Sequence, residues 1–283
     1  LVWTKRKSAS SSHYLSDSVR GGHKVLFSEL PAAEYDGTSN DDGVESFDSN
    51  GFTLKNGTYV NDYNASSSTY VAWNWLAGGT APSQTYTVKV VSDSGNKYRF
   101  DDFGTSAVTL NLQEGGTYTF DQSDSSNSGH PLRFSTTSDG THGSGSEYTT
   151  NVTTTGTPGS AGAKTVITVA ASAPTLYYYC TQHSGMGGQI NTNSTYGSTN
   201  FDGNILSTVS ANTSKGFSIV NWTYSTSADN LVGHGLSSPP TFMIVKSRTT
   251  AYNFDVYHSG LSAATKRLIL NHNSAEVSGF FDT

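Results

Sequence analysis

The two ends of the chain repeat each other at a nearly constant spacing, and this repeat limits the available folds more than any other feature of the sequence. LVWTK at residues 1–5 aligns with FMIVK at residues 242–246, an offset of 241 residues. After one residue of slippage, four more residues of the first copy (Lys24, Leu26, Ala33, Glu34) align with identical residues of the second (Lys266, Leu268, Ala275, Glu276). We therefore expect two copies of one module.

The copies differ in what surrounds the shared segment. The first copy continues through YVAWNW at residues 70–75, whereas the second is preceded by further strand-like sequence at 217–241. We predict that residues 1–79 are the C-terminal portion of one β-sandwich repeat and residues 216–283 the N-terminal portion of a second. Each portion alone leaves sheet edges uncovered. We expect neighbouring modules of a longer polypeptide to cover them or, alternatively, self-assembly in which one subunit donates strands to the next.

Composition points to an all-β fold. Only 13% of the 283 residues are charged, against about 25% in ordinary soluble domains. Polarity comes instead from Ser, Thr, Asn and 29 Gly, combined with 16 Tyr and 13 Phe. These residues suit short strands and turns better than helices. We predict tandem β-sandwiches.

Several classes of function are disfavoured. The net charge of −6 opposes nucleic acid as a partner, because phosphate binding needs a basic face. No stretch has the roughly 18 consecutive apolar residues of a membrane span, so we expect no membrane insertion. The sequence has no G-x-S-x-G elbow, P-loop or paired carboxylates placed in a cleft, and we expect the protein not to be an enzyme.

A different module lies between the copies, over residues 84–194. Apolar residues alternate in five runs, which predicts strands; the runs lie around residues 86–90, 108–112, 118–120, 130–134 and 176–180. We interpret the Gly-, Ser- and Thr-rich stretch 138–162 as a long surface loop. The polar residues 195–215 are predicted to be a linker.

The strongest chemical signal is YYYCTQHSGMGG at residues 177–188, which holds the only cysteine of the chain. Cys180, His183 and Met186 follow one another at intervals of three residues, and His130 begins the HPLRFS strand. One thiolate and two imidazoles with a weak axial thioether form the ligand set of blue copper. These four residues are our candidate metal ligands.

With these motifs, the middle module resembles the cupredoxins, Greek-key β-sandwiches that carry type 1 copper. The resemblance rests on EGGTYTF at 114–120, the histidine at the start of HPLRFS, and a C-x-x-H-x-x-M loop similar to the amicyanin type. It implies His130 and His183 binding copper through Nδ1, Cys180 as thiolate and Met186 axially. The stretch 138–162 is longer than small electron carriers usually have, and a sandwich that keeps the loop without copper is the alternative.

The flanking segments resemble lectin- or laminin-G-like modules of marine bacteriophage structural proteins and marine bacterial surface proteins. The motifs that carry this resemblance are YVAWNWLAGGT at 70–80, GFSIV at 216–220, VGHGL at 232–236, MIVKSR at 243–248 and VYHSGL at 256–261. It implies a structural or adhesive protein at a virion or cell surface, such as a tail fibre, decoration or filament segment, with a host glycan or receptor as partner. The alternative is a multidomain copper electron-transfer protein.

Two further features have ordinary explanations. DGTSNDDG at residues 36–43 clusters oxygen atoms but lacks EF-hand spacing, so we interpret it as a solvated turn. The four tryptophans (Trp3, Trp73, Trp75, Trp222) could stack on sugar rings. Their strand contexts fit core packing at least as well, and we expect most of them to be buried.

Overall fold

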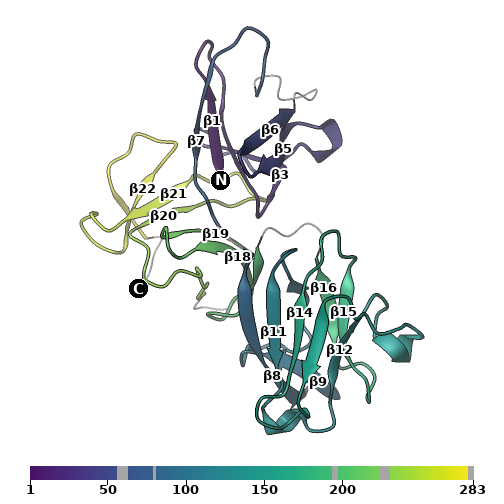
Figure 1. Ribbon diagram of the computed structural model, residues 1–283. Helices are drawn as coiled ribbons and strands as arrows, with labels where there is room; N and C mark the ends of the chain where they lie inside the picture. Colours follow the sequence, from purple (N-terminus) through teal and green to yellow (C-terminus); the bar gives the residue numbers. More distant parts are fainter. Residues whose placement is uncertain (56–62, 79–80, 193–196, 224–229, 280–283) are drawn as a thin grey trace. The chain divides into compact units, whose positions relative to one another are not determined.

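The computed structural model describes residues 1–55, 63–78, 81–192, 197–223 and 230–279, and it confirms an all-β protein (Figure 1). Strands joined by turns and three short 3-10 segments make up the regular structure of these residues. The chain divides into two compact units. Unit 1 contains residues 1–77, 214–217 and 236–283, and unit 2 contains residues 78–213 and 218–235.

Unit 2 is built on two sheets whose strands interleave in sequence. One sheet has the order β13-β14-β11-β8-β9 and the other β10-β16-β15-β12. Their strands are β8 (Ser83–Ser92), β9 (Asn96–Phe100), β10 (Leu110–Asn111), β11 (Thr117–Asp121), β12 (Leu132–Ser135), β13 (Val152–Thr155), β14 (Lys164–Thr168), β15 (Leu176–Cys180) and β16 (Gly188–Asn191). The β8–β11 and β10–β16 pairs are parallel, and the other pairs are antiparallel. The chain thus crosses repeatedly between the sheets, as in a β-sandwich.

One continuous core fills this sandwich, because alternate residues of both sheets point inward. Its largest side chains are aromatic and fully buried, and several pairs of them contact edge to face. Phe120, for example, packs against Phe100 at a ring-centroid distance of 5.7 Å and against Phe134 at 5.3 Å. Cys180 and Met186 belong to the same core.

Two segments of unit 2 contain more structure than the sequence predicts. The predicted loop 138–162 contains a 3-10 turn, η3 (Gly140–Gly143), and the strand β13. The predicted linker 195–215 contains the strands β17 (Ser198–Asn200) and β18 (Ser207–Asn212) of a sheet with the order β17-β18-β19, where β19 is Phe217–Trp222.

The strands β17 and β18 escaped prediction because most of their buried side chains are polar, with Val209 as the exception. Ser198, Thr199 and Ser207 are all less than 4% exposed. Hydrogen bonds replace the usual apolar packing: Thr199 Oγ1 accepts from the amide of Asn111 at 2.7 Å, and Tyr86 donates to the Thr199 carbonyl at 3.0 Å. Buried polar groups with such partners carry no hydrophobic pattern in the sequence.

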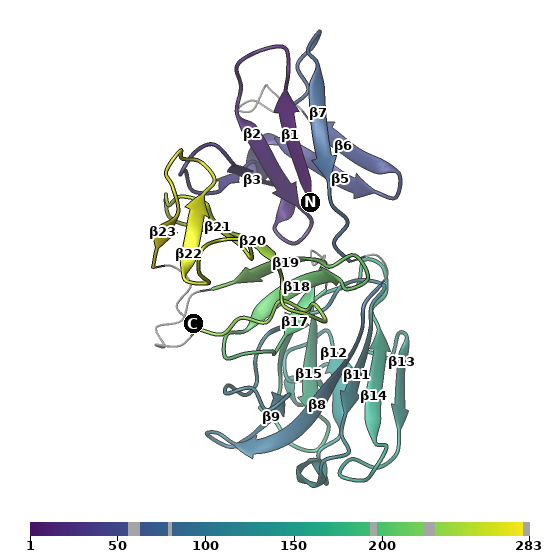
Figure 2. The same cartoon turned by 90° about the vertical axis from the view of Figure 1, so that its left-hand side faces the viewer.

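Unit 1 contains the two copies of the repeat (Figure 2). The first forms a sheet with the order β4-β3-β2-β1-β7, and the second a sheet with the order β20-β21-β22-β23. The strands of the first are β1 (Val2–Arg6), β2 (His13–Asp17), β3 (Gly21–Phe27), β4 (Tyr35–Asp36) and β7 (Tyr70–Asn74); those of the second are β20 (Phe242–Val245), β21 (Asp255–His258), β22 (Lys266–Ile269) and β23 (Val277–Ser278). The hairpin β5 (Gly43–Asp48) and β6 (Gly51–Lys55) forms a separate two-stranded sheet.

The strands of the two copies pair in the same register. Trp3 lies opposite Leu15 in the first copy, and their equivalents Ile244 and Val256 lie opposite each other in the second. The next two pairings also correspond residue for residue: Leu15↔Leu26 matches Val256↔Leu268, and Lys24↔Asp36 matches Lys266↔Ser278. The sequence repeat is therefore also a structural repeat.

The structure divides the ends of the chain differently from the predicted domains. Residues 1–77, 214–217 and 236–283 form one unit, and residues 218–235 of the second predicted portion belong to unit 2. Phe254 of the second copy is 1% exposed and packs against Leu15 and Leu26 of the first. Arg248 of the second copy forms a bidentate ion pair with Glu34 of the first, at 2.7 and 3.0 Å. The sequence repeat indicated two copies but gave no information about this contact.

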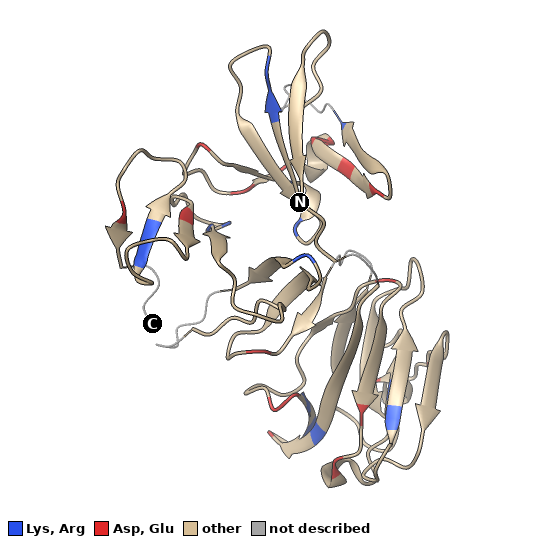
Figure 3. Ribbon diagram, turned by 60° about the vertical axis from the view of Figure 1, so that its left-hand side comes forward, with Lys and Arg blue, Asp and Glu red and all other residues tan. Residues whose placement is uncertain are grey.

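The expectation that most tryptophans lie in the core is wrong. Trp73 is 48% exposed, Trp75 39% and Trp222 38%. Only Trp3 is partly buried, beside Leu15, Leu26 and Phe254. Figure 3 shows the sparse charged residues spread over both units, and most of the ribbon is neutral. Among the described residues, no helix is long and apolar enough to cross a membrane.

Candidate metal centre

Cys180 lies at the end of β15, where that strand pairs with the start of β12. Its register partner is Leu132, and both residues are fully buried. The amide of Thr181 donates to the carbonyl of Pro131 at 3.1 Å, which keeps the two strands together just beyond the cysteine. The sulfur is thus fixed by the sandwich itself and not by a loop.

His130 lies two residues before β12, the strand that pairs with β15. Two buried side chains hold its backbone carbonyl: Tyr98 Oη and Gln122 Nε2 both donate to this oxygen at 2.9 Å. Gln122 also accepts from the amide of Leu132 at 3.1 Å through its Oε1. Tyr98 and Gln122 are at most 1% exposed, so buried side chains of the core hold the backbone of His130 in place.

His183 is exposed and lies in the loop that joins β15 to β16. This loop folds closely over β15 at Gly187, where a Cβ atom would lie 1.7 Å from the carbonyl oxygen of Tyr178. Only glycine permits so close an approach of two backbones. At Gly185, which has a positive φ of 69°, the amide donates to Asp139 Oδ1 at 2.8 Å.

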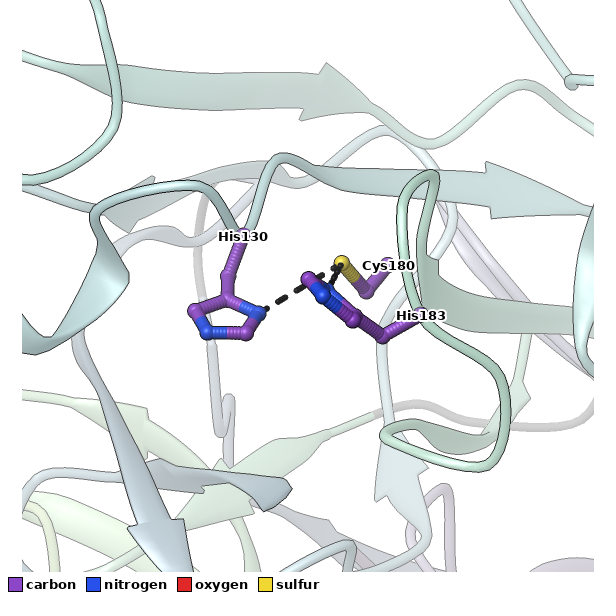
Figure 4. A group of neighbouring side chains, drawn as sticks. All are labelled: His130, Cys180 and His183. Atoms are coloured by element: carbon purple, nitrogen blue, oxygen red, sulfur yellow. Dashed lines mark hydrogen bonds between the residues drawn. The ribbon is translucent and has the colours of Figure 1, made fainter.

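These three residues converge on one point (Figure 4). Cys180 Sγ lies 3.8 Å from His130 Nδ1 and 3.7 Å from His183 Nδ1, and the centroids of the two imidazole rings are 4.6 Å apart. One ligand atom from each residue can therefore contact the same metal ion. The structure thus brings together three of the four predicted ligands, including one that is 50 residues distant in sequence.

Electrostatics favours the metal-binding form of one imidazole. Partial burial lowers the pKa of His130, and the neighbouring His183 ring lowers it further. A lowered pKa keeps the ring neutral at physiological pH, and only neutral imidazole offers a lone pair to a metal.

Met186, the fourth predicted ligand, is 1% exposed and lies in the same apolar core as Cys180. Its backbone carbonyl accepts a hydrogen bond of 3.0 Å from the amide of Tyr98. Among the described histidine, cysteine and carboxylate side chains, the group around the sulfur consists of His130, Cys180 and His183. Met186 as an axial ligand stays a prediction.

Two residues near the site were missed by the sequence analysis. His142 Nε2 lies 3.0 Å from the carbonyl oxygen of Cys180, to which it donates when it carries the proton. Asp139 holds the ligand loop through Gly185. Both belong to the stretch 138–162, which looks like a surface loop in sequence, and no spacing signal relates them to Cys180.

A second group of residues with side chains of the kind that bind metals, His23, Asp41 and Glu45, lies in unit 1. Here Lys55 Nζ sits 3.0 Å from Asp41 Oδ2 and 3.3 Å from Glu45 Oε2. The ammonium group balances both carboxylates, and this agrees with the interpretation of residues 36–43 as an ordinary acidic turn.

The fold and the site together define a β-sandwich protein with one cysteine sulfur and two imidazoles at one end of a strand pair. The family described as "Domain of unknown function (DUF7483)" matches residues 1–108 and 190–281, more than half of the chain, and the protein belongs to this family. No curated protein and no solved structure matches the chain. All four predicted ligands fall between the two matched segments, so family membership by itself carries no information about the site.

Proposed function

We propose that unit 2 binds one copper ion through His130, Cys180 and His183, with Met186 as a weaker fourth ligand. The observation that carries this proposal is the position of the only thiol of the chain near two imidazole nitrogens, at 3.8 and 3.7 Å. The strand order of unit 2 supports it too, because the resemblance to cupredoxins implies a two-sheet sandwich with these ligands on neighbouring strands.

The separations fit a shared ion. First-row metals such as zinc bond to sulfur at about 2.3 Å and to imidazole nitrogen at about 2.0 Å. With such bonds, the observed sulfur–nitrogen separations correspond to an angle at the metal of about 120°. A trigonal site of one thiolate and two imidazoles, with a thioether nearby, is typical of copper, and a closed tetrahedral set would favour zinc.

The chain itself supplies rigidity to the site. Tyr98 and Gln122 fix the backbone of His130, the strand pairing fixes Cys180, and Asp139 fixes the loop that carries His183. A bound copper would supply one-electron chemistry. Outer contacts that orient metal ligands commonly affect metal affinity as well.

The test is a titration of the full chain with Cu(II), followed by visible absorption. We expect an intense thiolate-to-copper band that saturates at one equivalent, and we expect Cys180→Ser to abolish it. His258→Ala serves as the control, because this histidine is exposed in unit 1, and the band should persist. A folded wild-type protein that stays colourless with Cu(II) would falsify the proposal.

For the whole protein we propose a structural or adhesive role in an extracellular or virion assembly. The conserved register of the two repeat copies supports this role, since repeated modules with the same pairing are suited to arrays. Purified particles or surface filaments of the source should contain the protein in stoichiometric amounts. Its recovery only as a free molecule contradicts the assembly role and leaves the copper proposal unaffected.

Electron transfer is the second candidate function, and the exposure of His183 favours it. The sulfur is buried while one imidazole ligand reaches solvent, so a redox partner could approach the site through that ring. Copper-loaded protein should then be reduced and reoxidised by a small redox reagent, with one electron per ion and no loss of metal. If reduction releases the metal, the electron-transfer candidate fails.

A further inference from the structure

The second copy of the repeat has an open sheet edge where the first copy has a strand. In the first copy, β1 pairs with β2 on one side and with β7 on the other. In the second copy, β20 corresponds to β1, and within the described residues its only strand partner is β21. Such an edge presents unpaired backbone donors and acceptors that can template another strand.

In the first copy, β7 also contributes aromatic side chains next to β1. Trp73 lies directly opposite Trp3, with ring centroids 5.7 Å apart. The ring of Trp75, the residue just after β7, lies 6.4 Å from that of Trp3. The position of Trp3 is therefore flanked by tryptophans on one side and by Leu15 on the other.

The corresponding apolar side chains of the second copy are exposed. Ile244, at the position of Trp3, is 41% exposed, and Phe242, two residues before it, is 53% exposed. Leu268 on the same face is 37% exposed, whereas its equivalent Leu26 is 7% exposed. Phe242 and Ile244 thus lie beside the missing strand, and Leu268 lies two strands away on β22.

We propose that the open edge of β20 is a docking site for a β7-type strand from a further module of the same repeat. The strand pairs antiparallel to β20 and places a tryptophan opposite Ile244. The register follows from the first copy, in which Val2, Trp3 and Thr4 pair with Asn74, Trp73 and Ala72. Their equivalents Met243, Ile244 and Val245 receive the corresponding residues of the incoming strand. Modules that dock in this way form a head-to-tail array.

The experiment adds a synthetic peptide of residues 69–76 to the full chain and measures amide hydrogen exchange in β20. At a peptide concentration about ten times the Kd, exchange should slow about tenfold for those amides of Phe242–Val245 that point away from β21. The reason is that only the unbound fraction exchanges freely. A peptide with Trp73→Asp should give no protection.

Two variants of the full chain make the peptide experiment specific. Ile244→Asp should abolish the protection. Leu231→Asp, at a side chain of unit 2 that is 65% exposed, should leave it unchanged. Thermal melting of each variant shows whether unit 1 remains folded, and Phe242→Asp replaces Ile244→Asp if the latter unfolds.

The proposal is overturned if β20 remains unprotected at the highest soluble peptide concentration, or if the Ile244→Asp variant is protected as well as the wild type. It is also overturned if β20 becomes protected without peptide as the protein concentration rises, because the occupant is then a second copy of this chain. None of these outcomes depends on copper.

Discussion

Strands β1–β4 and β20–β23 have the same order and register, yet side chains at equivalent positions differ in exposure and in their partners. Leu26 is buried beneath Phe254, whereas Leu268 is 37% exposed. Glu34 is bound by two arginines, whereas Glu276 is bound by Ser262. The strand pairing is thus retained between copies, while burial depends on which neighbour each copy has. Phe254 and Arg248 of the second copy contact Leu26 and Glu34 of the first, whereas the equivalent Leu268 and Glu276 are exposed. We therefore expect substitutions at these positions to cost more in the first copy.

The largest difference should come from Arg20, which lies between Asp17 and Glu34. Its Nε is 2.5 Å from Asp17 Oδ2 and its Nη1 is 2.9 Å from Glu34 Oε2, with all three side chains less than 10% exposed. Arg20→Met removes the positive charge that neutralises the buried carboxylates of Asp17 and Glu34. We expect it to lower the free energy of unfolding by about 3–5 kcal/mol, measured by urea denaturation with tryptophan fluorescence.

The control for Arg20 is Ser262→Ala in the second copy. Ser262 donates to Glu276, and both residues are exposed. We expect a loss below about 1 kcal/mol there, because water replaces the lost hydrogen bond. Equal losses in the two variants would show that burial of the Arg20 network has no energetic consequence.

A smaller contrast is expected at the equivalent leucines. Leu26→Ala should cost about 2–3 kcal/mol, because it leaves a cavity beneath Phe254. Leu268→Ala should cost less than about 1 kcal/mol, because its side chain is already partly in water. Both values come from denaturation of the full chain, and a larger effect at Leu268 contradicts the assignment of its face as uncovered.

The sequence predicted those features of the fold and of the candidate site that leave a recognisable pattern in the order of the residues. The repeat of residues 1–5 at 242–246 indicated strands that do pair alike. The spacing of Cys180 and His183, with the strand parity of His130, predicted a cluster that the structure contains. The all-β class followed from composition and is confirmed.

The parts that were not predicted depend on tertiary contacts. The strands β17 and β18 bury mostly polar side chains, such as the hydrogen-bonded Thr199, and these leave no hydrophobic alternation in the sequence. The packing of Phe254 on the first copy needs a neighbour more than 200 residues distant in sequence. The exposure of Trp73 and Trp75 was not predicted either, because large aromatic residues are usually buried. Trp73 lies on the edge strand β7 and Trp75 follows it, and exposed apolar residues of this kind can form a contact surface for another module.

The smallest difference between the copies concerns a cross-strand pair at their outer strands. Lys24 of β3 is bonded to Asp36 of β4, and at the equivalent position Lys266 donates to Ser278 Oγ at 2.9 Å. The hydrogen bond from Lys24 holds the pKa of Asp36 well below its usual value, and contacts with Thr38 lower it further. Because the folded-state pKa is depressed, the stabilisation is present above the unfolded pKa of about 3.9 and is lost as the pH falls below it.

Asp36→Ser gives the first copy the hydroxyl of the second. Since Asp36 is largely exposed, we expect a loss of less than about 1 kcal/mol at neutral pH. This loss should shrink in high salt and diminish below about pH 4. Denaturation curves of the two proteins at pH 3 and pH 7 measure the difference, and a loss that is independent of pH means that the carboxylate charge has no part in it.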